Sequence, residues 1–166
     1  ADEDDRLYLY RELYSTRRTV KVHAAQIKSL SEGETYTWTV CDHDAEDRAT
    51  LEENGIFNHA ADKRIRVGIE AVTERLKVAG DGRPRIFFMR NTLVEQDATL
   101  EAAKKPTFTY QEFAGYVWPK GTDSKPVKEL PVDMDNHGMD AMRYMVMSID
   151  NKALFAQVDS NPFYDG

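Results

Sequence analysis

Four carboxylates follow the most strand-like stretch of the sequence, residues 35–41 (Thr-Tyr-Thr-Trp-Thr-Val-Cys), which is β-branched and aromatic. They are Asp42, Asp44, Glu46 and Asp47. Open α/β sheets bind ligands at the carboxyl ends of their strands, and carboxylate oxygens are the ligands that Mg²⁺ prefers. The alternative to metal binding by Asp44 is a structural role as the N-cap of a helix that begins near Glu46.

A second polar group lies within the apolar helical pattern of residues 135–149. His137 and Asp140 are three residues apart and therefore share one face of the predicted helix. A helix this apolar must pack on a sheet, and a polar pair inside its first turn is costly to bury unless a metal or another partner compensates it. The alternative is that Asp133 or Asp135 caps the helix and that the pair faces water.

The two groups together indicate metal-dependent phosphodiester hydrolysis. A carboxylate at a strand edge, such as Asp42, meets an aspartate on a late helix, such as Asp140, if that helix packs across the edge. Two-metal hydrolysis needs such a cluster, because one metal activates the attacking water and the other stabilises the leaving oxygen.

The remaining reactive side chains favour ordinary roles. Cys41 is interpreted as a core thiol. Because it is the single cysteine, the sequence excludes an internal disulfide and a Cys-rich zinc site. The basic residues that begin a helix at Lys63 and Arg64 are typical of a solvated face. Lys120, Lys125 and Lys128 lie in a loop and are candidate DNA phosphate contacts. The sequence contains no P-loop motif.

Composition is that of one globular α/β domain. The chain has 166 residues, of which 41% are hydrophobic and 31% are charged, and its formal charge of −7 argues against DNA binding by bulk positive charge alone. Strands are predicted at residues 7–14, 35–41, 56–60, 85–89 and 116–118. Helices are predicted at residues 20–30, 46–53, 64–78, 109–114 and 135–149, and residues 91–105 have a partly helical pattern. The alternation predicts a central, partly parallel sheet within residues 1–150, followed by a tail at 151–166. No stretch is apolar enough for a membrane span.

Four segments, in this order, resemble the C-terminal nuclease domain of phage large terminase subunits. They are residues 7–14 (Leu-Tyr-Leu-Tyr-Arg-Glu-Leu-Tyr), 42–47 (Asp-His-Asp-Ala-Glu-Asp), 116–118 (Tyr-Val-Trp) and 135–144 (Asp-Asn-His-Gly-Met-Asp-Ala-Met-Arg-Tyr). The last is the most specific, because an Asp-x-His-x-x-Asp-Ala-x-Arg-Tyr helix is characteristic of that domain. The resemblance covers residues 1–148, with extra sequence near residues 99–109.

This resemblance implies a ribonuclease H-like fold, in which helices flank a mixed central sheet, and an endonuclease that uses Mg²⁺ or Mn²⁺ in a two-metal site to cut concatemeric double-stranded DNA. Asp42 matches the second catalytic aspartate of the family, Asp140 matches the aspartate of the late helix, and His137 matches a histidine near the metal. Asp44 and Asp135 are further acidic candidates. By analogy, the intact protein acts in the host cytoplasm with a portal protein, a small terminase subunit and its own ATPase domain.

One departure from the family concerns the first catalytic aspartate, which lies on a strand ahead of residues 7–14. The chain begins Ala-Asp-Glu-Asp-Asp, which is typical of the turn after that strand, so Asp2, Asp4 and Asp5 are poor substitutes. We therefore expect this chain to bind metal weakly and to cut DNA poorly or not at all.

Two alternatives stay open. One is a Holliday-junction resolvase or another ribonuclease H-like nuclease, which would use the same carboxylates on branched DNA. The other is a degenerate, non-catalytic module that docks to capsid or portal proteins. The Asp-Ala-x-Arg-Tyr segment favours the terminase, and a missing first strand favours the docking module.

Overall fold

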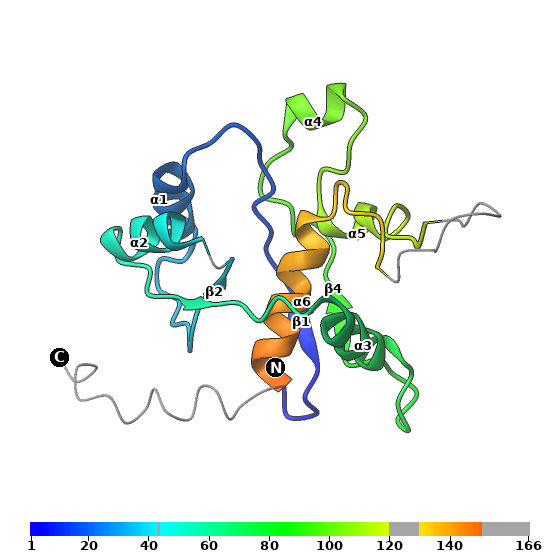
Figure 1. Ribbon diagram of the computed structural model, residues 1–166. Coiled ribbons are helices and arrows are strands. Elements are labelled where there is room, and N and C mark those ends of the chain that lie inside the picture. Colours follow the sequence, from blue (N-terminus) through cyan, green and yellow to red (C-terminus); the bar gives the residue numbers. More distant parts are fainter. Residues whose placement is uncertain (43, 120–129, 151–166) are drawn as a thin grey trace. The chain divides into compact units, whose positions relative to one another are not determined.

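The computed structural model describes residues 1–42, 44–119 and 130–150, which form helices and short strands in alternation (Figure 1). The mixed α/β class that the sequence predicts is confirmed. The chain divides into two compact units: unit 1 comprises Ala1–Thr19 and Val72–Met142, and unit 2 comprises Val20–Ala71 and the chain from Arg143 onward. The predicted tail at 151–166 and the loop lysines Lys120, Lys125 and Lys128 lie outside the described residues.

Unit 1 is built on a parallel pair of strands, β1 (Leu7–Leu9) and β4 (Ile86–Phe88). Leu7 lies opposite Ile86 and both are buried, whereas Tyr8 stacks on Phe87 on the other face, with 5.3 Å between ring centroids. Two short helices follow in the chain, α4 (Ala98–Ala102) and α5 (Thr109–Glu112).

The first five residues of unit 1 form the predicted turn. The backbone N–H of Asp5 donates to the carbonyl of Asp2 at 3.1 Å, and the Asp2 carboxylate accepts from the backbone N–H groups of Asp4 and Arg6. These bonds lower the pKa of Asp2 to about 2, with the bond from Arg6 the largest cause.

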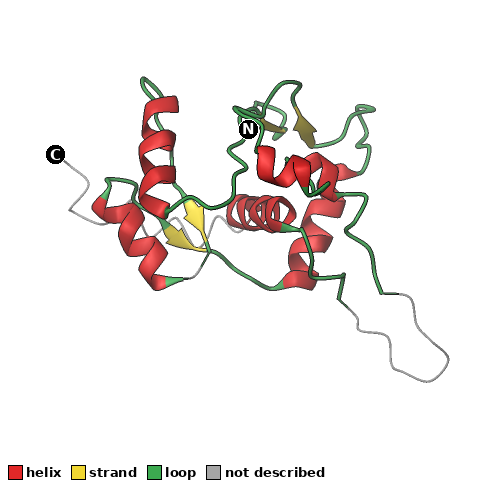
Figure 2. Ribbon diagram, turned by 90° about the horizontal axis from the view of Figure 1, so that it is seen from above, coloured by secondary structure: helices red, strands yellow, loops and turns green. Residues whose placement is uncertain are grey.

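Unit 2 contains two helices that pack side by side, α1 (Val20–Leu30) and α2 (Ala45–Glu53) (Figure 1). Its strands β2 (Val40–Cys41) and β3 (His59–Ala60) form a second parallel pair (Figure 2). The described strands thus form two separate two-stranded sheets, where one mixed central sheet was predicted.

Two longer helices contribute residues to both units, α3 (Ile65–Leu76) and α6 (His137–Asp150). Within unit 2 they cross at Gly68, where an added Cβ would lie 2.9 Å from the sulfur of Met147. Most of α6 is buried, including Met142, Tyr144 and Val146, as its apolar pattern predicts. Among the described residues, no helix has the length and hydropathy that crossing a bilayer requires.

Two predicted strands differ from the structure. Of residues 35–41, only Val40–Cys41 pairs with another strand, and the indole N–H of Trp38, just before this pair, donates to the Ser148 hydroxyl of α6 at 3.2 Å. Residues 116–118 form no strand; a bond from the N–H of Val132 to the carbonyl of Val117 joins them to the segment before α6. The strand predictions at residues 35–39 and 116–118 are therefore wrong, because β-propensity does not determine which segments find a pairing partner.

Candidate functional site

Asp42 lies at the carboxyl end of the β2–β3 pair, as the sequence predicts. The N–H of His59 donates to the carbonyl of Thr39, and the N–H of Ala61 donates to that of Cys41, so both strands end at the same edge. Lys63 follows β3 at this edge, and its Nζ lies 2.8 Å from Oδ1 and 3.1 Å from Oδ2 of Asp42. The parallel pairing therefore brings one carboxylate and one ammonium together where α/β sheets bind ligands.

The Asp42–Lys63 pair is exposed. The side chain of Asp42 retains 55% of its accessible surface and that of Lys63 retains 40%. An exposed ion pair of this kind contributes at most about 1 kcal/mol to stability, because water and salt screen it. Lys63 was predicted to lie on a solvated face, which is correct, but its pairing with Asp42 was not predicted.

The buried side chain of Asn58 holds this edge together. Its Oδ1 accepts from the Cys41 thiol at 3.0 Å and from Nε of Arg48 at 2.9 Å, and its Nδ2 donates to the Arg48 carbonyl at 3.1 Å. Asn58 thus joins β2 to α2 immediately before Asp42. Cys41 is half-buried, and burial raises the pKa of its thiol, which disfavours the thiolate that a nucleophile needs.

Asp44 is the N-cap of α2. Its Oδ1 accepts from the backbone N–H of Glu46 at 3.0 Å and from that of Asp47 at 3.1 Å, which satisfies two of the free donors at the start of the helix. The structure confirms the N-cap role of Asp44. Its participation in a metal site stays a prediction.

His137 and Asp140 lie in the first turn of α6, as predicted. His137 is the first helical residue and is exposed, whereas Asp140 is half-buried, with its N–H donating to the Asn136 carbonyl at 2.9 Å. Asp135 precedes the helix with a φ of 50° and forms an ion pair with Lys105, Oδ1 to Nζ 2.8 Å. Asp135 therefore has a cationic partner of its own within unit 1.

The cap of α6 is neither Asp133 nor Asp135, which corrects that alternative. The backbone N–H groups of Gly138 and Met139 donate to the two carboxylate oxygens of Glu112, at 3.0 and 2.7 Å. Glu112 lies at the end of α5, is only 1% exposed, and also accepts from the Tyr14 hydroxyl at 2.5 Å. Burial, and then this hydrogen bond, raises the pKa of the Tyr14 phenol.

Glu112 escaped the sequence analysis because nothing near it in the sequence marks it. Its partners lie 26, 27 and 98 residues away, so no cap motif or periodicity indicates the contact. The sequence instead offers nearer candidates, because Asp133 and Asp135 precede α6 and aspartate commonly caps helices.

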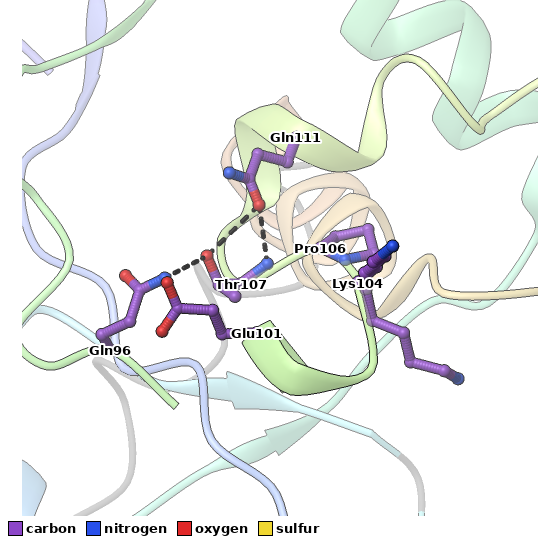
Figure 3. Close-up of a pocket in the computed structure, with 7 residues that line it drawn as sticks. Gln96, Glu101, Lys104, Pro106, Thr107 and Gln111 are labelled. Carbon is purple, nitrogen blue, oxygen red and sulfur yellow. Dashed lines mark hydrogen bonds between the residues drawn. The ribbon is translucent and has the colours of Figure 1, made fainter. Parts of the chain in front are cut away.

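A shallow pocket of about 430 Å³ lies beside α4 and α5 in the region of extra sequence (Figure 3). Its centre is polar, because the Thr107 hydroxyl accepts from Gln96 and donates to Gln111. Glu101 and Lys104 also line it, and Lys105 lines it while paired with Asp135. Its charges largely cancel, so its chemistry does not favour an anionic ligand.

The predicted site residues are thus distributed between the units: Asp42 and Asp44 belong to unit 2, and Asp135, His137 and Asp140 belong to unit 1. No group of three or more His, Cys, Asp or Glu side chains arranged to hold a metal ion occurs within residues 1–42, 44–119 and 130–150. A shared metal site stays a prediction. Comparison of the chain with models of protein families, with curated proteins and with solved structures found no match.

Proposed function

We propose that this chain is the metal-dependent endonuclease domain of a phage DNA-packaging terminase, with a ribonuclease H-like fold and double-stranded DNA as substrate. The observation that carries the proposal is the position of Asp42, an exposed carboxylate at the carboxyl edge of a parallel strand pair. The resemblance of the segment around His137 and Asp140 to the terminase nuclease helix supports it from a second part of the chain.

The segment before Asp42 has a defined neighbour within unit 2. Trp38, which precedes Asp42 by four residues, donates a hydrogen bond to Ser148 in the C-terminal part of α6.

The candidate side chains are of the chemical types that bind hard divalent cations. Asp42 and Asp140 offer carboxylate oxygens, which suit Mg²⁺ and Mn²⁺, and His137 offers an exposed imidazole, which suits Mn²⁺ better than Mg²⁺. When bound, two such ions supply an activated water and stabilise the leaving oxygen of the phosphodiester. Asp42 already attracts a cation, because the ammonium of Lys63 contacts both of its oxygens.

The proposed roles are those that the terminase resemblance implies. Asp42 and Asp140 hold the metal, and His137 either binds it or orients a water. Lys63 competes with the metal for Asp42, and on displacement its ammonium is available to a DNA phosphate. DNA is bound through its backbone with little sequence preference, which is compatible with a chain of net charge −7 because bound metal reverses the local field.

The test combines Mn²⁺ calorimetry with cleavage of supercoiled plasmid. The 166-residue chain is compared with the same chain extended by an N-terminal strand that carries an aspartate. We expect Mn²⁺ binding and plasmid cutting in at least one of the two forms, and loss of cutting in its Asp42→Asn and Asp140→Asn variants. Absence of Mn²⁺ binding in both forms would refute the proposal.

A non-catalytic docking module is the second candidate, and one feature favours it. Two of the acidic candidates already have ammonium partners, Asp42 in Lys63 and Asp135 in Lys105. A module of this kind predicts that the extended chain neither binds Mn²⁺ nor cuts DNA. Within the nuclease class, preference for four-way junctions over linear duplex would favour a resolvase-like enzyme.

A further inference from the structure

The two longest segments of the terminase resemblance meet on one side chain that lies in neither of them. Tyr14 ends the segment 7–14, Gly138 and Met139 belong to the segment 135–144, and all three donate hydrogen bonds to the carboxylate of Glu112. All of these residues belong to unit 1. Segments more than 120 residues apart are thus joined through Glu112.

Because the carboxylate of Glu112 is buried, it needs hydrogen-bond donors to replace water. Glu112 is 1% exposed, and the partners that the structure gives its carboxylate are one hydroxyl and two backbone N–H groups. The positive end of the α6 dipole compensates the carboxylate, and the carboxylate in turn satisfies two donors that would otherwise lack acceptors. Loss of either the carboxylate or the two N–H donors would therefore leave buried polar groups without hydrogen-bond partners, which is costly.

A second contact fixes the same turn independently. Glu12 accepts from the N–H and the hydroxyl of Thr109, at 2.7 and 2.5 Å, and so holds the start of α5. Gly138 packs directly on Thr109, because an added Cβ at Gly138 would lie 2.1 Å from the Thr109 hydroxyl and 2.9 Å from its Cα. The segment after β1 therefore contacts the first turn of α6 through two residues, Thr109 and Glu112.

We propose that Glu112 is a positioning residue for the metal site, an inference that rests on the proposed function. Its two N–H donors, Gly138 and Met139, lie in the sequence between His137 and Asp140. A displacement of this turn therefore moves both candidate ligands together. Glu112 acts through the backbone of α6 and touches neither metal nor substrate.

The test compares Glu112→Gln with Glu101→Gln, the same change at an exposed position of the same unit. Glutamine keeps the size of the side chain but presents an NH₂ group to one backbone N–H. Amide hydrogen exchange measures the cap, and Mn²⁺-induced broadening of the NMR signals of α6 measures metal proximity. Broadening detects metal binding even when the affinity is low.

We expect Glu112→Gln to speed amide exchange at Gly138 and Met139 by roughly tenfold or more, while exchange in α1 and α2 stays unchanged. The same variant weakens Mn²⁺ broadening at His137 and Asp140, and Glu101→Gln changes neither quantity. If Glu112→Gln does not fold, Tyr14→Phe serves instead, because it removes one donor and leaves the carboxylate in place.

Two results would overturn the positioning role. Unchanged exchange at Gly138 and Met139 would show that Glu112 does not hold the turn. Faster exchange with undiminished Mn²⁺ broadening would show a merely structural cap. Absence of Mn²⁺ broadening in the native chain and in its N-terminally extended form would contradict the proposed nuclease function itself, and with it any role in metal binding, whatever the exchange shows.

Discussion

Each unit of this protein has one buried polar side chain that organises its candidate ligands, but the two side chains differ in kind. Asn58 is neutral, and its partners Cys41 and Arg48 lie 17 and 10 residues away. Glu112 is acidic, and its partners extend to Tyr14, 98 residues away. A local, neutral centre and a long-range, acidic one should respond differently to truncation, to pH and to metal.

The largest expected effect is that of Glu112→Ala. The change removes the acceptor of two buried N–H groups and leaves a cavity, so the free energy of unfolding should fall by about 3 kcal/mol or more. Urea denaturation measures it, with Glu101→Ala as the control, which should stay within about 0.5 kcal/mol of the native protein. A loss as small as that of the control would show that Glu112 is not the centre of unit 1.

Asn58→Ala should come next, at about 1–2 kcal/mol, because it leaves the Arg48 guanidinium and the Cys41 thiol without their acceptor. Arg48 is half-buried and can turn toward water, which limits the cost. Amide exchange should speed up in β2 and α2 and not at Gly138. Equal losses of protection in both units would remove the distinction between the two centres.

Tyr14→Phe isolates one bond of the acidic centre. It removes the hydroxyl that donates to Glu112 and keeps the ring, so we expect a loss of about 1 kcal/mol in urea denaturation. A double variant with Glu112→Gln should lose less than the sum of the two single changes, because both act on the same carboxylate. Strict additivity would contradict the shared network.

Lys63→Gln should leave stability within about 0.5 kcal/mol, because the pair with Asp42 is exposed. Mn²⁺ affinity at Asp42 should rise by about threefold to tenfold when the competing ammonium is gone. Arg66→Gln is the matched control, since Arg66 lies three residues further along and pairs with Glu70. An unchanged or lower affinity in Lys63→Gln would argue against competition.

Acid should weaken unit 1 before unit 2, and this is the smallest expected difference. Hydrogen bonds, the largest from the Thr16 N–H, lower the pKa of Asp97 to about 2, and that of Asp2 is also lowered to about 2. A depressed pKa in the folded state adds stability above the unfolded value of about 3.9, and this stability is lost as pH falls toward 2. Amide exchange between pH 4 and 2 should therefore accelerate first around Thr16 and α4, and Asp97→Asn should remove that pH dependence.

The sequence predicts elements better than it predicts their partners. Val20–Leu30 was predicted with its observed bounds, because its apolar spacing alone defines it. Residues 35–41 were predicted as one strand, yet only Val40–Cys41 pairs, and strand propensity encodes neither this short pairing nor the bond from Trp38 to α6.

The same limit applies to the site. Asp42 at a strand end, Asp44 as a cap, and His137 with Asp140 in one helical turn all follow from local spacing. Lys63 and Glu112 do not, because their partners lie 21 and up to 98 residues away. A buried glutamate is also contrary to the usual expectation that Glu is exposed, so composition gives no warning of it.

The most direct test of the nuclease account is a Mn²⁺ titration that follows the NMR signals of Asp42 and Asp140 together. The account predicts that both signals broaden with one common midpoint and that Asp42→Asn abolishes the broadening at Asp140. Broadening at Asp140 that persists in Asp42→Asn, or broadening at only one of the two residues, would contradict a shared cation and the nuclease assignment that depends on it.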